Sequence, residues 1–253
     1  MHNDLFTVFG LTVHGYGLMV GLGVVAALLL SWRRARERSL SEDTVTALVL
    51  TALLSGFIGS KILYSLTHLD ALLADPLSVL GSEGWVVYGG LLGGIFGVWL
   101  YCRRKKLRFL QWGDLLLPGV AAAQCLGRIG CFLAGCCYGR PTQSWLGVVF
   151  PAGSFAPAGV PLLPTQLFSA AGNLALCLIL LRADKKDHPD GFILALYLLL
   201  YSVGRFAIEF LRDDYRGSVG ALSTSQFIAV FTAAASLVLM ALLRKKPTNG
   251  ETP

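Results

Sequence analysis

Charged residues are scarce in this sequence. They make up 14% of its 253 residues, whereas hydrophobic residues make up 55% and the mean hydropathy is +0.64. A soluble domain carries roughly a quarter charged residues, so this chain lacks the polar side chains that a soluble protein of its length needs on its surface. The shortage excludes a cytosolic enzyme and an intrinsically disordered chain.

Basic residues are missing before Arg33. A secretory signal peptide begins with a positively charged region, so we expect none here. Glycine is plentiful instead, with 29 residues. Small residues let helices approach closely in lipid, so this composition favours a membrane protein.

Seven stretches are apolar and long enough to cross a bilayer, which takes about 20 mostly apolar residues in a helix. They cover residues 16–32, 45–66, 85–102, 114–135, 164–182, 191–211 and 221–243, and Pro118 with several glycines breaks the fourth. The sequence therefore predicts an all-α integral membrane protein with seven transmembrane helices and a single domain over residues 1–253. The longest loop outside the cytoplasm, at about 136–163, is rich in Gly and Pro. It predicts a small extracytoplasmic cap or a stretch at the membrane interface.

The position of the basic residues explains the net charge of +6. Fifteen of the 21 follow the first, third, fifth and seventh stretches, on one side of the membrane. They are Arg33, Arg34, Arg36, Arg38, Arg103, Arg104, Lys105, Lys106, Arg108, Arg182, Lys185, Lys186, Arg244, Lys245 and Lys246. The positive-inside rule then predicts an extracytoplasmic N-terminus and a cytoplasmic C-terminus. No nucleic-acid partner is needed to explain these clusters.

Charges inside the apolar stretches are candidates for function, because charge is costly in a membrane. Arg205, Glu209 and Arg212 are spaced i, i+4, i+7, which places them on one face of a helix, and Tyr201 extends that face by a turn. They form either a structural ion pair or a cationic pocket for an anionic headgroup. Two arginines for one carboxylate leave a net positive charge, and the planar guanidinium suits a phosphate.

Arg128 lies in GRIGCFLAGCCYGRP, among the glycines Gly127, Gly130, Gly135 and Gly139. Glycine lets the backbone approach a ligand or bend sharply, although an arginine that snorkels to the interface is the alternative. Lys61 also lies inside a stretch, and for it we expect snorkelling.

Three of the six cysteines, Cys131, Cys136 and Cys137, follow a C-x4-C-C pattern at the end of the fourth stretch. They are small packing residues, a disulfide pair on an oxidising face, or a thiolate activated near Arg128. No metal is expected, because there are only three thiols, their spacing differs from paired C-x-x-C sites and no histidine is near. A membrane thiol oxidoreductase built on these cysteines lacks a C-x-x-C pair.

The stretch GRIGCFLAGCCYGRP resembles the signature of the bacterial prolipoprotein diacylglyceryl transferases, G-R-x-G-N-F followed by N-G-E-x-x-G. The resemblance extends in order over nearly the whole chain. It includes HGYGLMVGLG, EGWVVYGGLLGG, PTQLF, YSVGRFAIEFLR and STSQFIAV. The family's seven-span topology with an outer N-terminus agrees with the topology predicted from the charges.

The resemblance implies a multi-pass enzyme of the bacterial cytoplasmic (inner) membrane that acts in lipoprotein maturation. Such enzymes move a diacylglyceryl group from phosphatidylglycerol, a membrane lipid, to the lipobox cysteine of a secreted preprotein, and glycerol phosphate leaves. No cofactor or metal is implied. Arg128, Arg205, Glu209 and Tyr16 are then the expected catalytic residues. The expected phosphatidylglycerol-binding residues are Arg128, Arg205, Arg212, Gly127, Gly130 and Gly139.

Several signature positions are substituted. The two Asn positions hold Cys131 and Ala134, and the signature Glu is Cys136, next to Cys137. Tyr88 stands where the third stretch usually has His, and Ser169 where PTQLF is usually followed by Glu. The phosphate-binding half is thus kept and the polar half changed. Two alternatives follow: the same lipid donor with a different acceptor, or a non-catalytic lipid-binding or transport protein.

Overall fold

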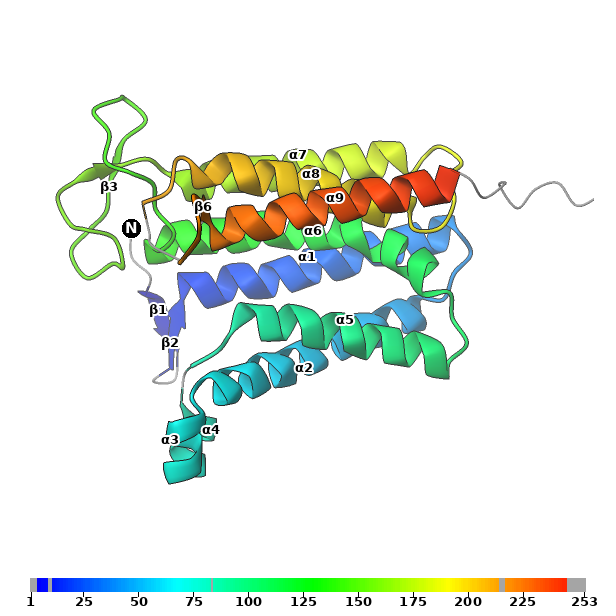
Figure 1. The fold of residues 1–253 in the computed structure, drawn as a ribbon, viewed down its shortest axis with the longest axis horizontal. Coiled ribbons are helices and arrows are strands. Elements are labelled where there is room, and N and C mark those ends of the chain that lie inside the picture. The colour runs from blue at the N-terminus through cyan, green and yellow to red at the C-terminus, as the bar shows by residue number, and fades with distance from the viewer. Residues whose placement is uncertain (1–3, 9–10, 83, 214–216, 245–253) are drawn as a thin grey trace, which may run out of the picture. The chain divides into compact units, whose positions relative to one another are not determined.

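The computed structural model describes residues 4–8, 11–82, 84–213 and 217–244, and Arg216, Lys245 and Lys246 lie outside this range (Figure 1). The chain divides into two compact units. Residues 1–31 and 113–253 form the first unit, and residues 32–112 form the second. Helices make up most of both, as expected for an all-α membrane protein. The single domain over residues 1–253 stays a prediction.

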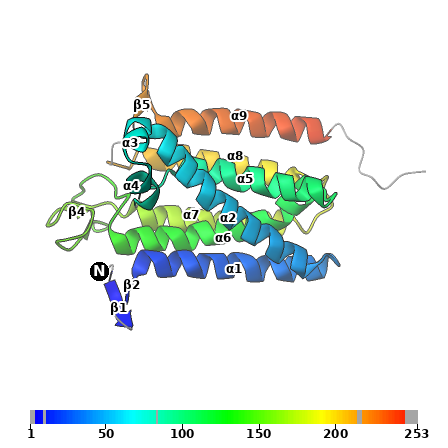
Figure 2. The same cartoon turned by 90° about the horizontal axis from the view of Figure 1, so that it is seen from below.

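Five long helices form the first unit, and their axes are roughly parallel to one another in both views of the ribbon (Figures 1 and 2). They are α1 (Gly15–Glu37), whose last turns enter the second unit, α6 (Phe109–Ala134), α7 (Thr165–Ala183), α8 (Phe192–Glu209) and α9 (Thr224–Arg244). The unit also has three short antiparallel strand pairs. β1 (Asp4–Val8) and β2 (Leu11–His14) precede α1, β3 (Val148–Val149) and β4 (Pro161–Leu162) lie between α6 and α7, and β5 (Ser218–Val219) and β6 (Leu222–Ser223) lie between α8 and α9.

Small residues bring α1 and α6 together in the first unit. A Cβ added to Gly23 would lie 3.1 Å from the carbonyl oxygen of Ala123, and one added to Gly119 would lie 2.8 Å from that of Ala27. The prediction that Pro118 breaks this segment is wrong, because α6 continues through it. Transmembrane helices tolerate proline where neighbouring helices satisfy or cover the freed backbone groups, and Pro118 is fully buried.

The second unit is an antiparallel helix pair, α2 (Glu42–Thr67) and α5 (Val87–Arg104), with the short helices α3 (Leu69–Ala74) and α4 (Pro76–Gly81) between them. The pair packs through glycine: added Cβ atoms on Gly59 and Gly89 would overlap the facing backbone. The GG-x-x-GG pattern of residues 89–94 is therefore explained by close helix packing.

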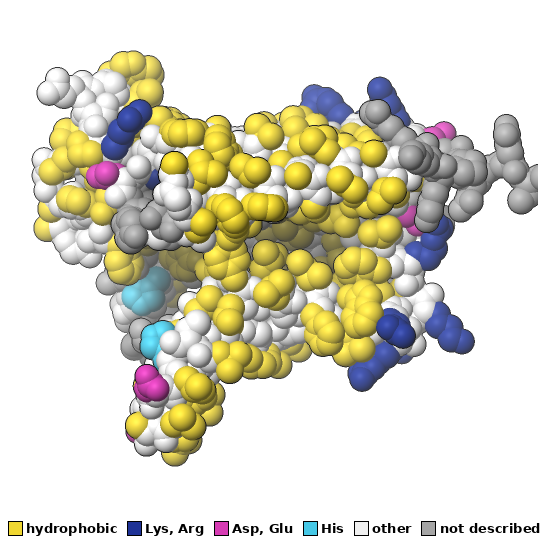
Figure 3. Space-filling model, in the orientation of Figure 1, with side chains coloured by type: hydrophobic (Ala, Val, Ile, Leu, Met, Phe, Trp, Pro, Cys, Tyr) yellow, Lys and Arg dark blue, Asp and Glu magenta, His cyan; other side chains and the backbone are white. Residues whose placement is uncertain are grey.

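Six described helices are long and apolar enough to cross a membrane: α1, α2, α6, α7, α8 and α9. The one remaining predicted stretch, the third at 85–102, forms α5 over 18 residues, and Arg103 and Arg104 end it. The chain is thus a multi-pass membrane protein, while seven crossings and the orientation of the termini stay predictions. In each unit taken by itself, Lys and Arg gather toward one end (Figure 3).

The loop at 136–163 folds around its own small core. Phe150, Ala156 and Leu162 are buried, with Phe132 and Tyr138 packed against them. The short strand pair β3 and β4 joins the middle of the loop to its end. This compact loop has the form expected of the predicted cap and follows directly on α6, where the signature residues lie.

Candidate active site

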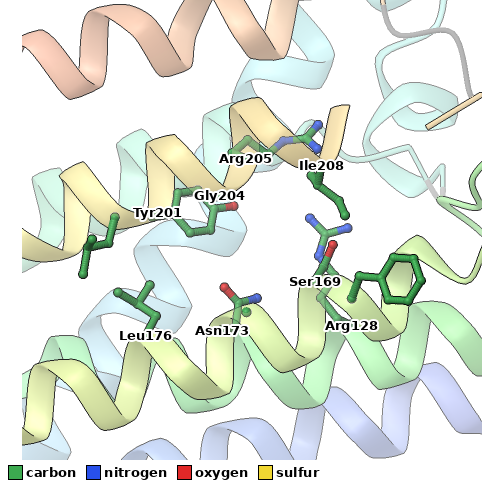
Figure 4. Close-up of a pocket in the computed structure, with 11 residues that line it drawn as sticks. Arg128, Ser169, Asn173, Leu176, Tyr201, Gly204, Arg205 and Ile208 are labelled. Atoms are coloured by element: carbon green, nitrogen blue, oxygen red, sulfur yellow. The ribbon is translucent and has the colours of Figure 1, made fainter. Parts of the chain in front are cut away.

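A cavity of about 160 Å³, which we call the arginine cavity, lies between α6, α7 and α8. Its charged groups are Arg128, from α6, and Arg205, from α8, and Figure 4 shows both guanidinium groups pointing toward the same space. α7 adds Ser169 and Asn173, and α8 adds Tyr201. Phe168, Gly172, Leu176, Leu200, Gly204 and Ile208 complete the lining. A space of this size takes a polar headgroup but not the acyl chains of a lipid.

Glu209, the last residue of α8, lies between two arginines. Its Oε2 atom is 2.8 Å from Nη1 of Arg205 and 4.0 Å from Nε of Arg212. All three side chains are nearly buried, at 8%, 13% and 2% exposed for Glu209, Arg205 and Arg212. The structure therefore brings together the three charges that the spacing placed on one helical face.

Arg205 keeps hydrogen-bonding capacity for a ligand. Its Nη2 donates to Oγ of Ser225 at 2.7 Å. Its Nη1 contacts Glu209 as an ion pair, but the N–H is not aligned for a hydrogen bond to any described residue. Arg128 and Arg212 both lie close enough to repel Arg205 electrostatically. Three guanidinium groups for one carboxylate make the site net positive, which favours an anionic ligand with several oxygens.

Arg212 lies on the turn after α8, since the helix ends at Glu209. Its backbone pairs with Gly139, and Arg140 donates a backbone hydrogen bond to Leu211 at 3.0 Å. A Cβ on Gly139 would lie 2.7 Å from the carbonyl oxygen of Leu211. We call residues 135–140, which follow α6, the signature loop. Gly139, predicted to bind lipid, lets this loop pack closely on the end of α8.

Cys131 and Cys136 are brought together by the way α6 ends. Gly135 is in the left-handed conformation, with φ 74°. Its N–H donates to Phe132 at 3.2 Å, and the N–H of Cys136 donates to the carbonyl of Cys131 at 3.1 Å. These two bonds define a Schellman motif, in which the residue after the glycine contacts the residue five positions earlier. A glycine directly after the apolar stretch is the sequence signal for this motif.

The backbone of Cys137 is also in the left-handed conformation, with φ 62°. This conformation directs its side chain toward Cys131 and Cys136. Two buried side chains at the start of α7 hold this backbone. Oγ1 of Thr165 donates to the carbonyl of Cys137 at 2.8 Å, and Nε2 of Gln166 donates to that of Cys136 at 2.7 Å. The PTQLF segment therefore positions the signature loop.

The three sulfur atoms of Cys131, Cys136 and Cys137 lie within 4.8 Å of one another, and we call them the sulfur cluster. No disulfide joins the described cysteines. The pKa of the Cys137 thiol is lowered, because Cys131 and Cys136 donate hydrogen bonds to it and Arg212 adds a further one. Arg128 also lies near Cys131. The cluster thus borders the arginines of the site.

Tyr16, the second residue of α1, lies among the same groups. It is 46% exposed, and Arg128 and the sulfur cluster are close enough to affect it electrostatically. Gly130 permits this approach, since its added Cβ would lie 3.3 Å from the Cα of Tyr16. Gly127, by contrast, faces open space, with nothing within 4 Å of an added Cβ.

Tyr88 is the one predicted site residue outside the first unit; it lies on α5 of the second. Lys61, on α2, was expected to extend toward the membrane interface, but it also makes contacts within the second unit. Its ammonium donates to the carbonyl of Ser82 at 2.7 Å and lies 4.8 Å from the ring centre of Trp85. Lys61 therefore anchors the loop before α5.

Sequence reasoning assigned no role to Gln166, Asn173 or Ser225. Gln166, Ser169 and Asn173 are spaced by three and four residues along α7, so they form a polar stripe on an otherwise apolar helix. Polar groups within a membrane helix usually face the protein interior. That spacing was the available signal for the polar wall of the arginine cavity.

The chain is similar in sequence to known proteins over nearly its full length. The family described as "Prolipoprotein diacylglyceryl transferase" matches residues 3–242. A Clostridium perfringens protein named phosphatidylglycerol–prolipoprotein diacylglyceryl transferase 2 is 44% identical over 96% of this chain and 97% of its own length. A Clostridium tetani protein with the same name, without the numeral, is 44% identical over 90% of this chain and 92% of its own length. A Dehalococcoides mccartyi relative is 37% identical over 83% of this chain and 82% of its own.

Proposed function

Because the chain belongs to the prolipoprotein diacylglyceryl transferase family, we propose that it transfers a diacylglyceryl group from phosphatidylglycerol to prolipoproteins in the bacterial cytoplasmic membrane. The acceptor is the lipobox cysteine thiol of a secreted preprotein. The observation that carries the proposal within the molecule is the arginine cavity, where Arg128 and Arg205 meet in a space of headgroup size.

The arginines bind the phosphate of the lipid and stabilise it as it leaves. Charge grows on the departing glycerol phosphate, and preorganised donors in a site with little water stabilise such charge strongly. Arg128 and Arg205 face the cavity, and Arg212 adds positive charge from the end of α8. Glu209 orients Arg205 through the 2.8 Å ion pair. The acyl chains remain outside the cavity, in the bilayer.

The reaction is a substitution at carbon. The acceptor sulfur attacks the glyceryl carbon that carries the phosphate, the carbon–oxygen bond breaks, and its electron pair leaves with glycerol phosphate. The thiol proton must be lost on the way, which needs a base or a positive field. Tyr16 lies near the cluster and Arg128, which supports a role for it in this step.

The site lies at the end of the first unit that secreted proteins reach. Arg182 lies in the last turn of α7, on the side with basic residues, while Glu209 and Arg212 lie at the opposite end, because α8 runs back along α7. The positive-inside rule assigns the basic end to the cytoplasm. The arginine cavity and the cap then face outward, in agreement with a translocated acceptor.

The test uses purified protein with labelled phosphatidylglycerol, with and without a lipobox peptide. We expect released glycerol phosphate and a peptide that gains the mass of one diacylglyceryl group. Arg205→Lys keeps the charge but loses the planar fork, so we expect a large loss of activity, with Arg103→Lys, on the basic side, as the matched control. Absence of release with and without peptide would contradict the transferase. Release of glycerol phosphate without modification of the peptide would contradict the proposal that the lipobox thiol is the acceptor.

A further inference from the structure

The sulfur cluster has the dimensions of a metal site. Its three sulfur atoms lie within 4.8 Å of one another. Three thiolates that bind one Zn²⁺ at about 2.3 Å lie about 4 Å from each other, so small side-chain rotations suffice to close them on an ion. Spacing along the chain and the absence of a nearby histidine predicted no metal, but the turn after α6 brings the three cysteines together, and three thiolates suffice when a substrate takes the fourth position.

The backbone of the cluster is held in place before any ion binds. The Schellman motif fixes Cys136 against Cys131, and Thr165 and Gln166 hold the carbonyls of Cys137 and Cys136. Metal sites need such support, since groups around the ligands orient them. Among the described residues no other set of His, Cys, Asp or Glu is grouped in this way. The remaining cysteines, Cys102, Cys125 and Cys177, are dispersed over three helices.

Charge at the cluster also suits a metal. Three thiolates and one Zn²⁺ carry a net charge of about −1. Arg212 donates to Cys137, and Arg128 lies near Cys131, so positive groups already face the sulfur atoms. Thiolate sulfur is a soft donor that favours zinc or Cu(I) over Mg²⁺ and Ca²⁺.

We infer that Cys131, Cys136 and Cys137 bind Zn²⁺, and that the fourth position takes the acceptor thiol. Three protein ligands with one open position characterise catalytic rather than structural zinc. This inference rests on the proposed function for its acceptor. A thiol that coordinates zinc is deprotonated outright, so the metal supplies what a general base would otherwise supply.

The step balances without an oxidant or reductant. The acceptor thiol releases its proton to solvent as its sulfur binds zinc. That sulfur then attacks the glyceryl carbon, and the carbon–oxygen bond breaks with its electron pair on the departing phosphate, which Arg128 and Arg205 receive. The product is a thioether, a weaker ligand than a thiolate, so it leaves the open position.

Zinc content of the full-length protein is the first measurement. After reduction, incubation with Zn²⁺ and desalting, we expect one Zn²⁺ per chain in the wild type and in Cys125→Ser and Cys177→Ala. Cys136→Ser should lose most of it while keeping its elution volume in gel filtration. Co²⁺ in place of Zn²⁺ should give sulfur-to-cobalt absorption in the wild type and much weaker absorption in Cys131→Ser. Equal zinc in wild type and Cys136→Ser, or none in the reduced wild type, overturns the inference.

Transfer to the lipobox peptide is the second measurement. Protein stripped by a chelator should lose transfer at least about tenfold, since changes to the groups around a metal site alone cost that much, and recover it when Zn²⁺ returns. Transfer that survives stripping, with zinc removal verified, overturns the catalytic role. If the zinc-loaded wild type releases no glycerol phosphate at all, the proposed function fails while the measured zinc site stands.

Discussion

The arginine cavity and the sulfur cluster are neighbours, but they are built in different ways. The cavity takes its charges from helix faces, where Arg205 and Glu209 are one turn apart. The cluster takes its sulfur atoms from the end of a helix, where Gly135 and Cys137 both adopt left-handed backbone. A helix face follows from the 3.6-residue period, whereas a turn depends on the segments that pack on it. The cavity therefore keeps the family's arginines with regular geometry, although Ser169 in its lining is substituted, and the cluster carries the substitutions of the signature itself.

The largest effect should come from the arginine cavity. Arg128→Ala removes a guanidinium that faces the cavity, and we expect transfer to fall by about 10²–10³-fold. Arg182→Ala, at the basic end of α7, is the control and should retain activity. Measurement of glycerol phosphate release compares the two. If Arg128→Ala turns over at the wild-type rate, the cavity does not receive the phosphate.

Gly139→Ala should damage both regions together, since this residue joins the signature loop to the end of α8. Its Cβ would lie 2.7 Å from the carbonyl oxygen of Leu211 and 2.7 Å from Cγ2 of Thr165. We expect a loss of about 1–3 kcal/mol of stability, as for overpacked sites, measured by denaturation in detergent. Gly21→Ala, on α1 with nothing within 4 Å, should not be destabilised. Equal stability of both variants would show that the backbone around Gly139 can move enough to accommodate a methyl group.

Thr165→Val should separate the two regions. The change removes the 2.8 Å hydrogen bond to the carbonyl of Cys137 and leaves that carbonyl without its donor, at a cost of about 1–3 kcal/mol. We expect weaker zinc binding, while the retention of lipid by the arginine cavity changes little. Thr232→Val is the control, because the hydroxyl of Thr232 makes an exposed hydrogen bond within α9, at 2.8 Å to the carbonyl of Ile228. A parallel loss of zinc and lipid would mean that the two regions are not independent.

The smallest effect lies at the basic end, away from both regions. The pKa of His188 is raised above its ordinary value, chiefly by the hydrogen bond to Asp184, with Asp114 also nearby. A raised pKa in the folded state stabilises the fold below about pH 6.5, and this contribution is lost as pH rises through the higher value. Thermal denaturation of the wild type should show this loss, and Asp184→Asn should remove it. An unchanged pH profile in Asp184→Asn would assign the effect to another group.

Much of the fold could be predicted from the sequence. Each of the seven predicted stretches overlaps a long helix, because apolar length alone is a strong signal for a membrane helix. Pro118 misled the prediction, since a rule for isolated helices ignores the neighbour that α1 provides. The cap core around Phe150 could not be foreseen, because its contacts join residues far apart in the loop.

The site was predicted to a similar degree. Arg205 and Glu209 were placed correctly side by side by their spacing. The contact of Cys131 with Cys136 had a signal in Gly135, although the motif was not recognised. The hydrogen bonds from Thr165 and Gln166 to the carbonyls of Cys137 and Cys136 had no signal in the sequence. About 30 residues of cap loop separate these partners along the chain.

The sequence by itself determined that the chain crosses a membrane, which end of each helix is basic, and which charges share a face of α8. These properties are local, because hydropathy, charge and helical period act over a few turns. Only the tertiary structure decided that α7 completes the arginine cavity and that three sulfur atoms meet beside it. Both depend on segments distant in sequence, and packing against those segments, rather than local preference, fixes the turn after α6.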